Sequence, residues 1–359
     1  MHRFSSRLIA WQRVHGRHDL PWQSADAYRV WLSEIMLQQT QVATVIPYFL
    51  RFVASFPTIA TLASATEEQV LAHWSGLGYY ARGRNLHHAA LIIVEKHHGQ
   101  FPREFEKIIE LPGIGRSTAA AICALAFHER RAILDGNVRR VLARYCGIQG
   151  WAGDKKVEEH LWRQAENLLP LPSGEGWGGG PGVEGVADIA TYTQALMDLG
   201  ATLCTRSKPK CDECPVRTDC VAFQTGRVRE LPTPRQPKAM PEKHTTFLLL
   251  MHGNDILLEK RPGSGIWGGL WCPPQFNDEF AAKDWFLRNG MEAREGERLE
   301  TFTHTFTHFR LHITPLKIQL ARKPLRAAQA GSVWQDAEEA SRAAIPAPVR
   351  ALLKECRRR

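Results

Sequence analysis

The 359-residue sequence predicts a mainly α-helical region over residues 1–225, a linker over 226–243 and a smaller α+β domain over 244–359. In the first region, apolar residues recur at helical spacing from Tyr28 to Met36 and again from Val138 to Tyr145. The linker is rich in Pro and Arg, which is typical of a semi-extended connection. Beyond it, residues 246–251 and 255–259 predict a hairpin, and residues 302–313 alternate as a strand does.

Composition and charge favour a partner with many negative charges and argue against a membrane-spanning or secreted protein. The net charge of +9 and the pI of about 9.2 suit a polyanionic partner, although merely basic proteins share that balance. No apolar run reaches the roughly 18 residues that a membrane span needs, and the first residues lack a signal-peptide core. We therefore expect a cytoplasmic protein without a membrane partner.

The stretch from 111 to 145 organises the helical region. The run Leu111-Pro112-Gly113-Ile114-Gly115 ends a helix, because Pro lacks an N–H group and Gly permits positive φ. Residues 118–127 are apolar on all sides and predict a buried helix. The bare amides of Gly113 and Gly115 at its start would form a site for a nucleic-acid phosphate; the alternative is an ordinary turn between two helices.

Asp135 follows just before the next helix, whose dipole would favour its ionised form; the alternative is a simple helix cap. A hairpin with an Asp at this place resembles the helix–hairpin–helix DNA glycosylases, in which the Asp faces the sugar of a flipped-out nucleotide. Members that also cut the strand carry a Lys eighteen residues before the Asp, where this chain has Ser117. Serine cannot form a Schiff base, so the resemblance implies a monofunctional enzyme with water as the final nucleophile.

Glu34 lies on the helix predicted from Tyr28 to Met36, where a lone Glu on the polar face is usually just solvated. The surrounding run 31–42, Trp-Leu-Ser-Glu-Ile-Met-Leu-Gln-Gln-Thr-Gln-Val, closely resembles the signature of the MutY-type adenine DNA glycosylases. That resemblance implies that Glu34 is the general acid, that Gln39 inserts into the base stack and that Thr40 lies beside the damaged base.

Further positions follow from the same resemblance. Leu77 would lie at a DNA-inserting wedge and Tyr79 would intercalate; without the family context, this run is a turn before a helix. Trp22 would border the base pocket, and is otherwise a core or hinge residue. Gln194 would contact the adenine, and is otherwise a surface side chain.

Four of the eight cysteines form a cluster with the spacing Cys204-x6-Cys211-x2-Cys214-x5-Cys220. Four thiolates so close in the chain fit either a zinc ion or an iron–sulfur cluster, and the spacing alone does not choose between them. The resemblance does choose, because this is the 4Fe–4S loop of the endonuclease III and MutY branch. It implies a structural cluster with a basic loop that faces DNA.

The second domain resembles the Nudix fold around residues 265–274. The Nudix metal box is missing after Gly268-Gly269, so we reject pyrophosphohydrolase activity. In MutY-type enzymes a Phe-Ser-His run inspects 8-oxoguanine, and here the matching run is Phe306-Thr307-His308. Thr307 keeps the hydroxyl and adds a methyl group.

The resemblance implies a six-helix barrel and a cluster-bearing helical domain that flank a groove. It implies hydrolysis of the N-glycosidic bond of adenine paired with 8-oxoguanine or guanine in double-stranded DNA. Ionised Asp135 would stabilise the cationic sugar or capture it transiently, and Asn137 and Ser117 would support it by hydrogen bonds. We expect a monomer that acts on the bacterial nucleoid.

Two alternatives stay open. One is a bifunctional, endonuclease III-like enzyme for oxidised pyrimidines, against which Ser117 and the second domain argue. The other is a non-catalytic DNA-binding or iron–sulfur protein. A Gly-rich insertion at 172–187 is expected to be a solvent loop without an assigned function.

Overall fold

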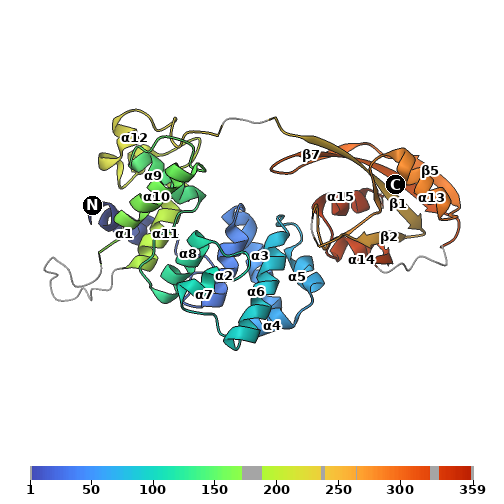
Figure 1. Cartoon of the computed structure of the whole chain (residues 1–359), viewed down its shortest axis with the longest axis horizontal. Helices are drawn as coiled ribbons and strands as arrows, with labels where there is room; N and C mark the ends of the chain where they lie inside the picture. The colour runs from blue at the N-terminus through green and yellow to red at the C-terminus, as the bar shows by residue number, and fades with distance from the viewer. Residues whose placement is uncertain (1, 172–187, 236–238, 264, 324–330, 357–359) are drawn as a thin grey trace. The chain divides into compact units, whose positions relative to one another are not determined.

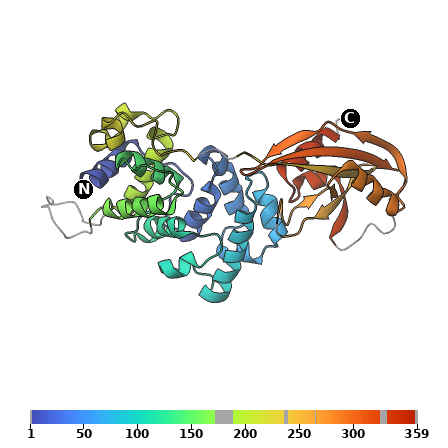
Figure 2. The same ribbon diagram turned by 45° about the horizontal axis from the view of Figure 1, so that its top comes forward.

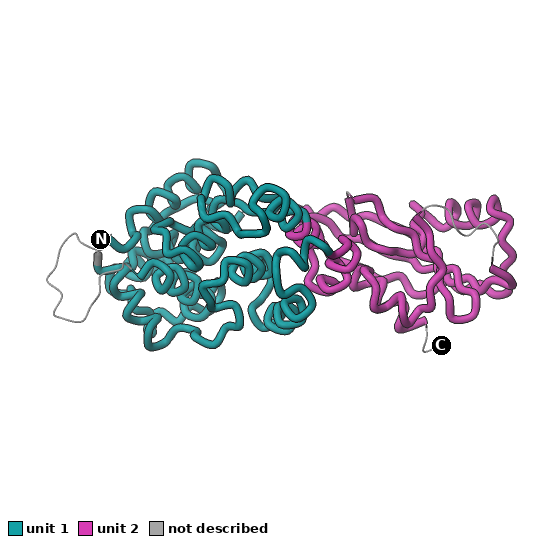
Figure 3. The backbone as a smooth tube through the Cα atoms, turned by 90° about the horizontal axis from the view of Figure 1, so that it is seen from below, with its two compact units in different colours: residues 1–64, 88–236 teal, residues 65–87, 237–359 magenta. Residues whose placement is uncertain are grey.

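The computed structural model describes residues 2–171, 188–235, 239–263, 265–323 and 331–356. Contacts divide the chain into two compact units, Met1–Ser64 with His88–Gln236 and Ala65–His87 with Pro237–Arg359 (Figure 3). The sequence did not indicate that Ala65–His87 belongs with the second unit. The predicted loop at 172–187 lies outside the described residues.

The first unit is helical in its described residues, as predicted (Figure 1). Its helices are α1 (His2–His15), α2 (Ala27–Leu37), α3 (Val42–Ser55), α4 (Ile59–Ser64), α7 (Phe105–Ile109), α8 (Arg116–Phe127), α9 (Gly136–Tyr145), α10 (Lys155–Asn167), α11 (Ile189–Asp198) and α12 (Val221–Gln224). Helix α6 (Ala81–His97) starts in residues of the second unit and ends in the first. No helix of the described chain combines the length and the apolar character that crossing a membrane requires.

Helix α2 forms where the apolar spacing predicted it. Asp26 caps its start by accepting a hydrogen bond from the Tyr28 amide at 2.9 Å. Trp31 and Met36 on its inner face are completely buried, and burial of each such side chain contributes about 1.5–3 kcal/mol. This packing fixes the helix that carries Glu34.

Helices α8 and α9 confirm the predicted hairpin region. Gly113 has φ of +81°, a conformation that disfavours residues with a Cβ, and Gly115 is the N-cap of α8. The α8 run from Ala119 to Ala124 is buried. It shares one hydrophobic core with α1, α9, α10 and α11.

A π-helical turn, Leu199–Leu203, follows α11 and packs against α9. A Cβ at Gly200 would lie 2.6 Å from the Asn137 Cβ, so only glycine fits here. The Gly200 carbonyl accepts a hydrogen bond from Arg140 Nη2 at 2.7 Å. This close approach sets the position of the first turn of α9, which begins next to Asp135.

The second unit contains helix α5 (Glu67–Trp74) and a mixed sheet (Figure 2). The main strand order is β3-β2-β1-β7-β5, with β4 beside β1, β6 beside β7 and β8 beside β2. Its strands and helices are β1 (Glu242–His252), β2 (Asp255–Lys260), β3 (Trp271–Cys272), β4 (Gln275–Phe276), α13 (Glu279–Arg288), β5 (Ala293–Arg298), β6 (Phe302–Thr305), β7 (Arg310–Leu320), β8 (Ser332–Asp336), α14 (Ala337–Arg342) and α15 (Ala347–Cys356).

The predicted hairpin is confirmed, because β1 and β2 pair antiparallel with Met251 opposite Ile256. The prediction of a single strand from the alternation over 302–313 alone is wrong, whereas the family resemblance implies a loop at Phe306-Thr307-His308. The Phe306 amide donates to the Phe309 carbonyl at 2.9 Å and closes a turn, so β6 and β7 pair antiparallel on either side of it. Alternation continues through a tight turn, which is why the pattern did not reveal the break.

The contact at Gly200 predicts a cost for added volume. Gly200→Ala should lower the free energy of unfolding by about 1–3 kcal/mol, because the new methyl group must displace the α9 backbone at Asn137. Thermal unfolding measures the change. Gly296→Ala in β5, where a Cβ meets no atom within 4 Å, is the matched control and should change little. Equal melting temperatures for both variants would contradict this packing account.

Candidate active site and cysteine cavity

Two carboxyl groups from different helices of the first unit are close enough for one to act electrostatically on the other. Glu34 comes from α2, and Asp135 stands at the start of α9. Burial raises the pKa of Glu34 to about 8, and the negative charge of Asp135 raises it further. The structure therefore brings together the two residues that the sequence predicted as a catalytic pair.

Asp135 is the N-cap of α9, so it acts as a helix cap, as the alternative interpretation of the sequence expected. Its Oδ1 accepts a hydrogen bond from the Val138 amide at 2.7 Å. Burial raises the pKa of Asp135 above its ordinary value, while the amides of Val138 and Asn137 and the charges of Arg140 and Arg139 oppose that rise. The helix amides favour the ionised form of Asp135, as expected. The effect of desolvation on its pKa is nevertheless larger, so the pKa rises.

The two carboxyl groups differ in their surroundings. Every cause that acts on Glu34 raises its pKa, whereas Asp135 receives backbone amides and two arginine charges that favour the carboxylate. The pKa of both carboxyls is raised by burial, but only Asp135 also has backbone amides and arginine charges that favour its ionised form.

Ser117 and Asn137 help to fix the position of Asp135. Ser117 binds the backbone before Asp135, and Asn137 forms a side-chain hydrogen bond within α9. Ser117 Oγ accepts a hydrogen bond from the Leu134 amide at 2.9 Å, which fixes the residue before Asp135. Asn137 Oδ1 accepts from Arg140 Nη2 at 2.8 Å. Direct bonds to the sugar-facing carboxylate, which the sequence suggested, stay a prediction.

Trp22 and Gln194 line one cavity of about 460 Å³. Both are nearly buried, and the Trp22 ring packs edge-on against Phe49 at 5.4 Å between centroids. The surface-Gln alternative for Gln194 is wrong, since only 9% of it is exposed. Among described residues, the lining of this cavity does not include Glu34 or Asp135.

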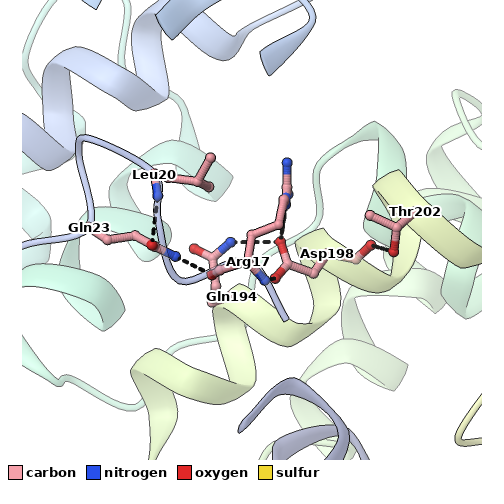
Figure 4. Close-up of polar contacts among 6 residues, drawn as sticks. All are labelled: Arg17, Leu20, Gln23, Gln194, Asp198 and Thr202. Atoms are coloured by element: carbon pink, nitrogen blue, oxygen red, sulfur yellow. Dashed lines mark hydrogen bonds and ion pairs between the residues drawn. The ribbon is translucent and has the colours of Figure 1, made fainter. Parts of the chain in front are cut away.

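A buried ion pair that the sequence analysis missed orients Gln194 (Figure 4). Asp198 is 1% exposed and accepts from Arg17 Nη2 at 2.5 Å and from Gln194 Nε2 at 2.8 Å on the same oxygen. Gln194 and Asp198 lie four residues apart on a buried helix face, and two polar residues at that spacing were the available signal.

The loop that carries Trp22 is held by the same network. Gln23 Nε2 donates to the Arg17 carbonyl at 2.7 Å, and Gln23 Oε1 accepts from the Leu20 amide at 3.1 Å (Figure 4). The Arg17 amide in turn donates to Asp198 at 2.9 Å. The loop between α1 and α2 is therefore fixed to α11.

The four predicted ligand cysteines line one cavity of about 30 Å³. Arg144 lines it too, is 3% exposed, and donates to Cys204 Sγ at 3.3 Å and to the Thr205 carbonyl at 2.7 Å. In the described residues, no three His, Cys, Asp or Glu side chains are placed to hold a single metal ion.

Helix α9 joins the cysteine loop to the carboxylate pair. Arg140 Nε donates to the Cys204 carbonyl at 2.7 Å, and its Nη2 bonds Asn137, two residues beyond Asp135. One arginine side chain thus spans from the first cysteine to the start of the helix that Asp135 caps.

The residues predicted to touch DNA in the first unit lie at its surface. Gly113 and Gly115 are exposed, and no atom lies within 4 Å of a Cβ built at Gly115. Gln39 is exposed just past α2 with φ of +57°, and Thr40 is half-buried. Their roles in DNA binding stay predictions.

Two predicted DNA-reading segments belong to the second unit. Tyr79 has φ of +49° and is 43% exposed, whereas Leu77 is buried. Thr307 and His308 are exposed at the β6–β7 turn, and the Phe306 ring stacks on Phe309 at 4.5 Å between centroids.

Comparisons with known proteins agree with this arrangement. Residues 32–167 match the HhH-GPD superfamily of base excision DNA repair proteins, and residues 245–355 match the NUDIX domain. The chain is 38% identical to the adenine DNA glycosylase of Buchnera aphidicola (subspecies Acyrthosiphon pisum) over 98% of its own length and 97% of that protein. It is 32% identical to the human adenine DNA glycosylase over 95% of its length and 72% of that protein.

A solved structure of a thermostable thymine-DNA glycosylase is similar at 26% identity, with a TM-score of 0.52, over 62% of this chain and 95% of that one. The likeness covers the helical part of the fold that the sequence predicted.

The buried carboxyl of Glu34 predicts a pH-dependent cost in stability. Between its ordinary pKa of 4.5 and its folded value of about 8, the folded chain keeps a proton that the unfolded chain has lost, so stability falls as pH rises. Glu34→Gln removes this loss of stability, because glutamine does not ionise. From pH 4.5 to 8, the free energy of unfolding of the variant, measured by thermal unfolding, should rise relative to that of the native chain by on the order of 2 kcal/mol.

The control is Glu300→Gln, because Glu300 is exposed in the folded chain. Its difference from the native chain should stay constant with pH. A constant difference for Glu34→Gln as well would show that Glu34 ionises normally.

Proposed function

The chain belongs to the adenine DNA glycosylase family, and from that membership we propose that it excises adenine standing opposite 8-oxoguanine or guanine in double-stranded DNA. It is a DNA N-glycosylase, a hydrolase of base-excision repair, and its substrate is DNA. Our proposal concerns which base stands opposite the excised adenine and what each residue of the site does.

The observation that carries the mechanism is the proton on Glu34. With a pKa of about 8, this carboxyl is mostly protonated at neutral pH, and it is thus a suitable general acid. Adenine is a poor leaving group as an anion, so Glu34 protonates it at N7 before or as the bond to the sugar breaks. A protonated carboxyl next to an ionised one is the arrangement that glycosidases also use.

Asp135 then faces the positive charge that develops on the sugar. Its carboxylate, supported by the amides of Val138 and Asn137, stabilises the oxocarbenium-like centre until water attacks. Glu34, now deprotonated, can assist that water. Ser117 offers no amine, so the strand is left intact at an abasic site.

The base must leave the stack before Glu34 can reach it, and unstacking a mispaired base costs a few kcal/mol. The exposed amides of Gly113 and Gly115 at the start of α8 would hold a phosphate, and Gln39 would enter the stack. Tyr79 would intercalate from the second unit. The buried position of Leu77 suits a residue that supports this loop from beneath.

The opposite base would be read by the β6–β7 turn. Thr307 and His308 are exposed there and carry the hydroxyl and imidazole groups that can hydrogen-bond a purine edge. Phe306, packed on Phe309, would hold the turn in shape. In the first unit, Trp22 and the oriented amide of Gln194 would border and contact the adenine.

The cysteine cavity supports a 4Fe–4S cluster held by Cys204, Cys211, Cys214 and Cys220. The four thiols line one cavity, and four Cys ligands in one loop suit an iron–sulfur cluster as well as zinc. The choice of the iron–sulfur cluster rests on the resemblance of the cysteine spacing to the loop of the endonuclease III and MutY branch. The cluster would tie the loop after α11 together, and base excision would not use its redox chemistry.

We further propose that the chain acts as a monomer on the bacterial nucleoid, consistent with its positive charge and its bacterial relatives. Sedimentation of the purified chain at the mass of a dimer would refute the monomer.

The function predicts a specific product. With a duplex holding one adenine opposite 8-oxoguanine, in single turnover, strand breaks should appear only after alkali treatment. Glu34→Gln should lower the rate by about 10²–10⁴-fold while binding persists. The native rate should fall above pH 8, because the acid form of Glu34 is lost, and should fall again in acid as the carboxylate of Asp135 takes up a proton.

Breaks without alkali, or cleavage of oxidised pyrimidines instead, would favour the endonuclease III-like alternative. An unchanged rate in Glu34→Gln would remove this residue from the chemistry.

The cofactor proposal predicts a broad brown visible absorbance of the purified chain that iron chelation abolishes. Cys211→Ser should lose much of this absorbance and melt at a lower temperature, because the loop loses a ligand. Cys146→Ser is the matched control, since Cys146 also lies in the first unit but outside the cavity lining. Zinc in place of iron, without colour, would refute the iron–sulfur cluster.

A further inference from the structure

The segment Ala65–His87 packs with the second domain, far along the chain (Figure 3). It consists of α5, the loop that holds Tyr79 and the first turns of α6. The loop is unusual, because Gly76, Gly78 and Tyr79 all have positive φ. A non-glycine residue in that region is strained and keeps its conformation only where its surroundings hold it.

The first anchor of this segment comes from α6 and α5. Arg84 Nη1 donates to the Gly268 carbonyl at 2.5 Å, and the Trp271 indole donates to Glu68 at 2.6 Å. Gly268 is buried, so its carbonyl depends on the Arg84 guanidinium. The neighbouring Gly269 has φ of +76°, and a Cβ there would lie 3.1 Å from Glu67 Oε1, which shows how closely the two surfaces approach.

This anchor leads directly to the turn that would read the opposite base. Trp267 precedes the carbonyl that Arg84 binds, and 6% of it is exposed. Its ring centroid lies 5.6 Å from that of Phe306 and 5.8 Å from that of His304. Arg84 is thus separated from the Phe306-Thr307-His308 turn by a single packed tryptophan.

The second anchor holds the other end of the Tyr79 loop. Ser75, the C-cap of α5, donates through Oγ to the Ile345 carbonyl at 2.8 Å. Arg350 of α15 donates to the same Oγ at 2.7 Å and to the Ser341 carbonyl at 2.7 Å. Ser75 is buried, so the contact is shielded from water.

We propose that Arg84 and Arg350 are positioning residues that fix the Tyr79 loop and the Phe306-Thr307-His308 turn in one rigid body. Intercalation beside the mispair and inspection of the opposite base then occur together, so the opposite base controls whether Tyr79 enters the stack. This inference rests on the proposed function, which assigns both segments to DNA.

The experiment compares single-turnover excision rates of the full-length chain on adenine opposite 8-oxoguanine and opposite guanine. A 2-aminopurine beside the mispair reports unstacking by its fluorescence. Arg84→Met and Arg350→Met should each reduce the 8-oxoguanine preference about ten-fold and weaken the fluorescence rise, because a charged hydrogen bond in each anchor is lost. Arg350→Lys, which keeps one donor, should recover part of both signals.

The matched control is Arg342→Met. Arg342 also belongs to the second unit, but its side chain is 75% exposed and pairs with Glu338 on its own helix. Arg342→Met should prefer 8-oxoguanine over guanine as the opposite base to the same degree as the native chain. Thermal unfolding checks each variant, and Ser75→Ala tests the second anchor from its other side if Arg350→Met does not fold.

Folded anchor variants with the native preference and the native fluorescence rise would overturn this inference alone. A native chain that shows no preference for 8-oxoguanine, or no excision, would instead overturn the proposed function. A loss of rate equal on both substrates, with no change in fluorescence, would mean that the anchors serve only stability.

Discussion

The chemistry proposed for this protein depends on the desolvation of two carboxyl groups, Glu34 and Asp135. Burial makes a negative charge costly at both Glu34 and Asp135, so the pair holds a proton near neutral pH. The first amides of helix α9 and the charges of Arg140 and Arg139 favour the ionised form of Asp135, whereas no such cause acts on Glu34. This difference in hydrogen-bond donors and nearby charges is what suits the two carboxyls to the separate roles proposed for them.

This arrangement requires α9 to be held firmly, and much of the first unit serves that end. Ser117 fixes the residue before Asp135, Gly200 lets the π-helical turn approach Asn137, and Arg140 binds that turn and the Cys204 carbonyl. Arg144, one turn further along, is buried against the cysteine loop. The cysteine loop therefore acts on the site through the backbone of α9, without contact with the carboxylates being needed.

The second unit likewise holds a segment that comes from another part of the chain. Its sheet core packs independently around Leu248, Leu250 and Leu257, yet its surface binds α5 and the start of α6. The Nudix-like domain thus lacks the metal box of a hydrolase and uses its surface as a support for a loop of the helical region. A domain can therefore set the position of a segment that belongs to another part of the chain in sequence.

The sequence by itself determined the helices, the hairpin and the family, because periodicity and motif spacing are local properties of the chain; the roles of Glu34 and Asp135 stay predictions. Periodicity alone did not reveal the break between β6 and β7, and nothing in the sequence revealed the Arg17–Asp198 ion pair or the second-unit membership of Ala65–His87. Each of these depends on which residues meet across long stretches of chain. Only the tertiary structure decided that burial raises the pKa of both Glu34 and Asp135, since desolvation depends on the packing around a group and not on its neighbours in sequence.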